Sequence, residues 1–192
     1  MALFASGQVC ALREVILADK PQELLTASAK ATVPVLVLPN DIVIDQSLDI
    51  MLWALAKNDP QNWLACQQPA LELIAESDGP FKHNLDRYKY GTRYPGEPPQ
   101  EHRQKGQLFL TNLDARLGEN PFLLGPGVSL ADIAIFPFVR QFANTDRQWF
   151  DQLNLPNLHN WLAERLHSEL FTSVMKKYPQ WKTGDEDVKF VV

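Results

Sequence analysis

The sequence predicts an α+β fold in which a small domain with short strands precedes an all-helical domain. Two runs rich in β-forming residues, 10–17 and 35–44, lie near the start and are bounded by Pro, Asn and Asp. Beyond residue 60 the apolar residues recur only at helical spacing. The polar segment 57–60 is typical of a linker, so we predict domains at 1–56 and 61–178.

The composition indicates a globular protein without a nucleic-acid or membrane partner. Of the 192 residues, 45% are hydrophobic and 21% are charged, which is ordinary for a soluble domain. The net charge of −5 gives no basic surface for nucleic acid. No apolar run approaches the ~20 residues that span a bilayer, and the start MALFASG lacks the basic region of a signal peptide.

The cysteines and histidines predict no disulfide framework and no metal site. Cys10 and Cys66 form no C-x-x-C motif, and a reducing cytoplasm is therefore the expected location. The histidines show neither an H-E-x-x-H motif nor close pairing, and we expect all of them on surfaces or helix faces: His83, His102, His159 and His167.

The first elements are short. Residues 2–5 are typical of the last turn of a helix, with Gly7 as its C-cap. Residues 10–17 predict a strand that ends at Asp19-Lys20-Pro21, and 21–28 predict a short helix with Pro21 in its first turn.

The stretch 33–55 carries the strongest local pattern. Pro39-Asn40-Asp41 is turn chemistry between two apolar runs, so 35–44 predicts a β-hairpin. A helix follows from Asp45-Gln46-Ser47, with Leu48, Met51, Leu52 and Leu55 on its buried face.

Pro34 and Ser47 suggest a binding edge in this stretch. We predict that the Val33–Pro34 bond is cis, which leaves the backbone of Val33 free to pair outside the sheet. Gln46 and Ser47 lie at a helix N-terminus, where free N–H groups attract a carboxylate. The alternative is an ordinary strand–turn–strand–helix in which Ser47 only caps the helix.

Helices are predicted over most of the remaining chain. Leu108, Leu110, Leu113 and Leu117 are expected to face inward on the helix at 100–118, and Ser77-Asp78-Gly79-Pro80 is expected to break the pattern before it. The tail 184–192 receives no assignment. The other helices are predicted at 61–76, at 81–90, from Ser129, from Pro156 and at 168–177.

Ser129 and Asp132 form a capping-box variant at the start of an apolar helix. Val128 and Ile133 are placed as a hydrophobic staple, and Pro137 implies a kink. Replacing Ser129 or Asp132 with Ala should cost about 0.5–2 kcal/mol.

Two of these motifs together resemble the glutathione S-transferase family. V-P-V-L, a turn and then Gln46-Ser47 at a helix start resemble its N-terminal domain, and Ser129-Leu130-Ala131-Asp132-Ile133-Ala134 resembles the core helix of its C-terminal domain. The resemblance covers residues 10–175 and implies a thioredoxin-like domain followed by an all-helical domain.

The resemblance also implies site residues. Val33 would pair with the cysteinyl part of glutathione beside the cis Pro34, and Gln46 and Ser47 would hold its γ-glutamyl end. Lys30 would meet a glutathione carboxylate, although a solvated loop lysine is an alternative. Where the family has S-P-K-G, this chain has Ser28-Ala29-Lys30-Ala31.

The second-substrate pocket of the family lies between its domains. The candidates by position are Tyr88, Tyr94, Arg140 and Trp149, and core packing is the alternative for each aromatic.

The N-terminal domain is expected to be incomplete relative to the family. Members begin with a further strand and a helix that carries the catalytic Ser, Cys or Tyr, whereas MALFASG resembles only the tail of that helix. No catalytic residue is therefore assigned; Cys10 lies at a strand start, where nothing lowers its pKa. We expect weak or undetectable conjugation. For the sheet, we expect 10–17 to pair directly with 35–38 in three strands, or another chain to add a strand.

Three functions remain open. The first is a glutathione transferase that conjugates or reduces small electrophiles with glutathione as co-substrate, and without a metal. The second is a non-catalytic binding or assembly module of the same fold, and the third is a glutaredoxin-like thiol reductase. The resemblance further implies a homodimer.

Overall fold

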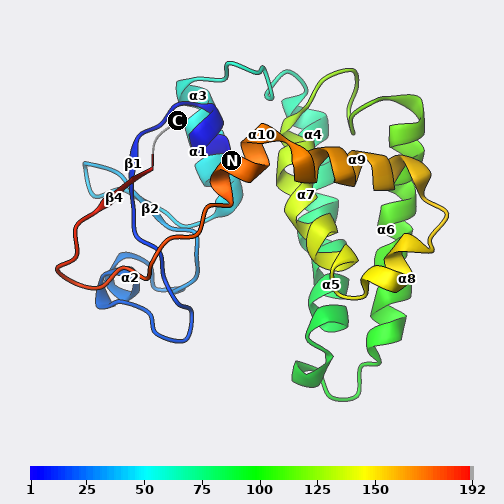
Figure 1. The fold of residues 1–192 in the computed structure, drawn as a ribbon, viewed down its shortest axis with the longest axis horizontal. Coiled ribbons are helices and arrows are strands. Elements are labelled where there is room, and N and C mark those ends of the chain that lie inside the picture. The colour runs from blue at the N-terminus through cyan, green and yellow to red at the C-terminus, as the bar shows by residue number, and fades with distance from the viewer. Residues whose placement is uncertain (191–192) are drawn as a thin grey trace. The chain divides into compact units, whose positions relative to one another are not determined.

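The computed structural model of the chain describes residues 1–190, which form two compact units (Figure 1). The first unit combines Met1–Gln61 with the residues from Glu169 onward, and the second unit is Asn62–Ser168. This grouping differs from the predicted ranges 1–56 and 61–178 at its C-terminal end, because helix α10 (Glu169–Val174) packs against α1 (Ala2–Ala5). Within the described residues no helix has both the length and the apolar content needed to cross a bilayer.

The first unit contains the predicted hairpin. Strands β2 (Leu36–Val37) and β3 (Val43–Ile44) pair antiparallel, with Leu36 opposite Ile44. Asp41 in the turn has φ +61°, a conformation that Asp tolerates better than most residues. Helix α2 (Gln22–Ala27) and helix α3 (Ser47–Lys57) confirm the two helices predicted around the hairpin.

The predicted pairing of 10–17 with 35–38 is wrong. The strand is shorter than expected, β1 (Cys10–Leu12), and it pairs antiparallel with β4 (Val188–Phe190), with Cys10 opposite Phe190. Among the described residues there are thus two separate two-stranded sheets. The tail supplies the backbone partners for β1, so neither the hairpin nor a second chain is needed for this role; residues 191–192 of the tail lie outside the described residues.

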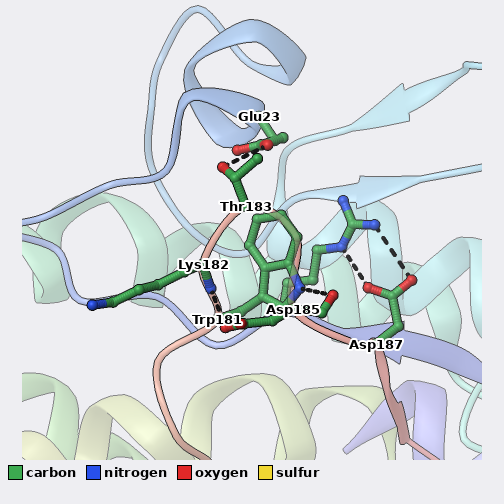
Figure 2. Close-up of polar contacts among 7 residues, drawn as sticks. Glu23, Trp181, Lys182, Thr183, Asp185 and Asp187 are labelled. Atoms are coloured by element: carbon green, nitrogen blue, oxygen red, sulfur yellow. Dashed lines mark hydrogen bonds and ion pairs between the residues drawn. The ribbon is translucent and has the colours of Figure 1, made fainter.

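Polar contacts hold the segment that leads into β4 (Figure 2). The backbone N–H of Trp181 donates to the carbonyl of Glu14 at 2.8 Å, and the Trp181 ring is buried. Thr183 donates to the carboxylate of Glu23 at 2.8 Å, and Arg13 forms an ion pair with Asp187 at 2.8 Å. The C-terminal segment is therefore an integral part of the first unit.

The second unit is helical throughout. The expected break at 77–80 is wrong: a π-helical turn, η1 (Ser77–Phe81), continues the helical path across Pro80, whose missing N–H leaves the regular ladder unfilled. The predicted helix at 61–76 begins later, at Gln67. The remaining elements are α4 (Gln67–Glu76), α5 (Lys82–Lys89), η2 (Gly91–Arg93), α6 (Pro99–Glu119), α7 (Leu130–Ala143), α8 (Arg147–Asp151) and α9 (Pro156–His167).

Helix α6 buries one face against its neighbours. Leu110, Leu113 and Leu117 are buried as predicted, whereas Leu108 is 72% exposed and its inward placement is wrong. Leu108 lies two residues from Leu110, which is about 200° around an α-helix, so the two cannot share a face. Gly106 lies on the buried face, where a Cβ atom would meet the Phe142 ring at 2.5 Å.

The predicted capping box at the start of α7 is confirmed. Asp132 is completely buried and accepts the N–H of Ser129 at 2.9 Å. The same carboxylate also accepts the N–H of Leu123 at 3.1 Å and the indole N–H of Trp161 at 2.9 Å. Asp132 therefore joins the helix start to a loop and to α9.

Candidate functional site

The loop before the hairpin leaves backbone groups unused. The Val33–Pro34 bond is cis, as predicted. Val33 is 45% exposed, and within residues 1–190 its N–H and C=O make no backbone hydrogen bond. An extended peptide could therefore pair with Val33.

Asp45 ties this loop to the start of α3. Its carboxylate accepts hydrogen bonds from the Ser28 hydroxyl at 3.0 Å and from the Lys30 ammonium at 3.0 Å. Lys30 and then Ser28 lower the pKa of Asp45, so the carboxylate stays ionised. Sequence reasoning missed Asp45; its only signal was a carboxylate directly before the predicted binding pair.

Gln46 and Ser47 lie at the N-terminus of α3 as expected. Gln46 is the N-cap and Ser47 the first helical residue. Among the described residues no side chain caps this helix, so Ser47 does not act as its cap. The first helical bond runs from the Ile50 N–H to the Gln46 carbonyl. The earlier N–H groups of the turn have no partner within the helix, and both predicted side chains are exposed beside them.

The side chains of Lys30 and Cys10 are each held by a contact within the first unit. The Lys30 ammonium is already paired with Asp45. The Cys10 thiol points to the Gln8 carbonyl at 3.9 Å, and burial raises its pKa. A thiol that is protonated at neutral pH is a poor nucleophile, which argues against a reductase built on Cys10.

Two of the four second-substrate candidates contact each other in the second unit. The ring centroids of Tyr88 and Trp149 are 6.4 Å apart, and both rings pack on the Phe142 ring. The Tyr88 hydroxyl is buried without a hydrogen-bond partner among the described residues, and burial raises its pKa. The guanidinium of Arg103 lies 4.4 Å from the Trp149 ring.

The other two candidates lie apart from this aromatic cluster. The Tyr94 ring packs under the Arg87 guanidinium at 4.4 Å. Arg140 lines a hollow of about 380 Å³ together with Lys89, Gln141, Asn144 and Thr145. Within the described chain, Tyr88, Tyr94, Arg140 and Trp149 therefore do not converge on one pocket.

Comparison with family models places both parts of the chain in one family. Residues 1–63 match the model described as "Glutathione S-transferase, N-terminal domain", and residues 100–164 match "Glutathione S-transferase, C-terminal domain". The chain belongs to the glutathione S-transferase family. The expected fold class is confirmed: a thioredoxin-like N-terminal domain and an all-α C-terminal domain. No curated protein matches the chain.

Solved structures share the glutathione S-transferase fold. A glutathione S-transferase from Rhodospirillum rubrum is 18% identical, with 85% of this chain and 79% of that chain covered and a TM-score of 0.65. A glutathione transferase family member from Pseudomonas fluorescens, solved with two glutathione bound, is 19% identical over 77% of this chain and 72% of that chain, with a TM-score of 0.63. A glutathione transferase from Burkholderia graminis, also with glutathione bound, is 20% identical over 77% and 68%, with a TM-score of 0.64.

Proposed function

We propose that this glutathione S-transferase family member binds glutathione and conjugates it to small electrophiles, or reduces them with it. The observation that carries the proposal is the loop around Val33, where the backbone of Val33 is unpaired within the described residues. Asp45 bonds Ser28 and Lys30 of this loop and so joins the loop to the open N-terminus of α3. The backbone suits a peptide and the helix start suits a carboxylate.

Each residue has a role in this proposal. Val33, next to Pro34, pairs with the cysteinyl part of glutathione, and Gln46 and Ser47 bind its γ-glutamyl carboxylate. Lys30 neutralises Asp45, which otherwise would repel that carboxylate, and it lies within reach of a second carboxylate of the ligand. Glutathione bound at these two points would have its cysteinyl residue, which carries the thiol, held at Val33.

The electrophile is proposed to bind in the second unit. Tyr88 and Trp149 offer aromatic surface for an apolar ligand, and Arg140 and Tyr94 are the remaining candidates. A cytoplasmic location and a homodimer belong to the same proposal. The cytoplasmic location agrees with two cysteines that are both free thiols.

Calorimetry with glutathione tests the binding half of the proposal. Ser47→Ala removes one hydrogen bond to a charged group and is expected to weaken binding about 10- to 100-fold. Ser173→Ala, an exposed serine of α10, is the matched control and should bind as the parent chain does. Equal affinity of the two variants would refute the assigned site.

A conjugation assay with an aryl halide tests the catalytic half. Turnover whose KM for glutathione is raised in Ser47→Ala supports a transferase. Glutathione binding without turnover would favour the alternative of a non-catalytic binding module, and the raised pKa of Cys10 already weighs against the thiol-reductase alternative.

A further inference from the structure

Three metal-binding side chains from separate elements meet in the second unit. His83 lies on α5, His102 on α6 and Glu97 in the segment that joins them. Figure 1 shows these two helices and the segment between them. One ligand atom of each residue lies within 4.8 Å of the other two. Two imidazoles and a carboxylate form a donor set that Zn²⁺ commonly takes.

The hydrogen bond with Asn84 decides which nitrogen of His102 can bind a metal. The amide nitrogen of Asn84 donates to the Pro80 carbonyl at 2.7 Å, so its amide oxygen is the atom that faces His102 Nδ1 at 2.8 Å. An amide oxygen can only accept, and therefore Nδ1 carries the proton. This leaves His102 Nε2 as the ligand atom, with its ring held by an outer hydrogen bond, as metal-bound histidines usually are.

The spacing of the first two ligands is already close to that of a metal site. His102 Nε2 lies 3.1 Å from Glu97 Oε2, an ion pair when that nitrogen carries a proton, and Zn²⁺ would displace this proton on binding. Tetrahedral bonds of about 2.0–2.1 Å place two ligand atoms about 3.3–3.4 Å apart. His83 is exposed and its ring makes no hydrogen bond within the described residues, so a side-chain rotation can bring it in.

Arg87 keeps the carboxylate ionised but limits the affinity. It donates to Glu97 Oε2 at 2.7 Å and is the main reason why the pKa of Glu97 is lowered. Its positive charge also partly cancels that of the carboxylate, which favours binding of modest strength.

We propose that His83, Glu97 and His102 bind one Zn²⁺ ion, with water in the fourth position. Such an ion would join α5 to α6 at a place independent of the glutathione residues, all of which lie in the first unit. It is a site that the histidine spacing in the sequence did not predict.

Titration of Zn²⁺ into the full chain, freed of metal by a chelator, tests this site by calorimetry. One equivalent is expected to bind, and His83→Ala and Glu97→Gln should each weaken the affinity at least about tenfold. His83 and Glu97 lie outside the buried core, so these variants are expected to fold, and circular dichroism checks this.

His167→Ala is the matched control, because His167 is an exposed histidine whose ring, within residues 1–190, hydrogen-bonds only the Ala163 carbonyl of its own helix. Its Zn²⁺ affinity should equal that of the parent chain. The proposal is overturned if the parent chain binds no Zn²⁺ at about 0.1 mM, or if His83→Ala binds as tightly as His167→Ala.

Discussion

Asp132 shows how much a single buried carboxylate can hold. It accepts N–H groups from Ser129, Leu123 and Trp161, and it is fully buried. Removal of the side chain would leave several donors buried without an acceptor, each at a cost of about 1–3 kcal/mol. The structure therefore raises the cost of this substitution above what a helix cap alone would give.

We predict that Asp132→Ala lowers the free energy of unfolding by about 3–5 kcal/mol, and Ser129→Ala by only about 1 kcal/mol. Urea unfolding followed by tryptophan fluorescence measures both. Asp132→Asn, which keeps one acceptor oxygen, should fall between them. Equal losses for the two alanine variants would mean that the contacts to Leu123 and Trp161 contribute nothing.

Asp45 makes the first unit sensitive to acid. Its pKa is lowered in the folded state by Lys30 and Ser28, so the stabilisation that it gives is complete above its ordinary value of about 3.9 and is lost as the pH falls through the lower folded value. We expect the melting temperatures of the parent chain and Asp45→Asn to differ at about pH 6 and to converge as the pH falls below the lowered folded pKa of Asp45.

The control for this acid dependence is Asp41→Asn. Asp41 is exposed in the hairpin turn and makes no ion pair within the described chain, so Asp41→Asn removes no ion pair and should not reproduce the difference seen for Asp45→Asn. A difference for Asp45→Asn that does not shrink as the pH falls below the folded pKa of Asp45 would show that its contact with Lys30 is not the cause.

At the scale of elements, Gly106 permits the close packing of α6 against Phe142 of α7. A Cβ atom would lie 2.5 Å from the aromatic ring, which a packed core cannot absorb cheaply. We predict that Gly106→Ala destabilises the protein by about 1–3 kcal/mol although Ala favours a helix. Thermal unfolding measures this.

Gly118→Ala, in the same helix, is the control for Gly106→Ala. Its Cβ would meet only the end of the Asn157 side chain, at 3.2 Å, so the gain in helix propensity should remain. A stabilised Gly106→Ala variant would mean that α7 can shift away from α6.

Trp181 anchors the segment that carries β4. Its ring is 7% exposed, its backbone bonds Glu14, and Arg13 lies over it at 4.4 Å. Trp181→Ala is expected to cost about 3–5 kcal/mol and to speed amide exchange at Cys10–Leu12. Lys182→Ala, at the exposed neighbouring residue, should change neither the stability nor the exchange rate. If the amides of Cys10–Leu12 stay protected in Trp181→Ala, the pairing of β4 with β1 does not depend on Trp181.

Local elements were more predictable from the sequence than strand partners. The hairpin at 35–44 and the helix at 47–57 follow from residues that are neighbours in the chain, namely a turn tripeptide and an apolar face. The partner of β1 depends on residues far along the chain, and the tail carries no strong pattern of its own. The same reason applies to the proposed binding residues: Gln46 and Ser47 were predicted from local sequence, whereas Asp45 was recognised only through its contacts with Ser28 and Lys30.

At the scale of the whole molecule, the proposed homodimer is directly measurable. Light scattering on the purified chain at about 10 μM should give twice the chain mass of 21.8 kDa. A monomer at that concentration would contradict the expectation that family resemblance supplies.

The pairing of β1 with β4 has a consequence for the order in which this protein assembles. Arg13 and Asp187 are 174 residues apart, and an unstructured loop of that length opposes their meeting through its entropy. The whole second unit lies between them in sequence, so its earlier folding would shorten the effective loop. During synthesis β1 leaves the ribosome long before β4, so β1 cannot pair until the whole second unit and then β4 have been made. The helical unit should therefore fold first, and the pairing of β1 with β4 would close the other unit last.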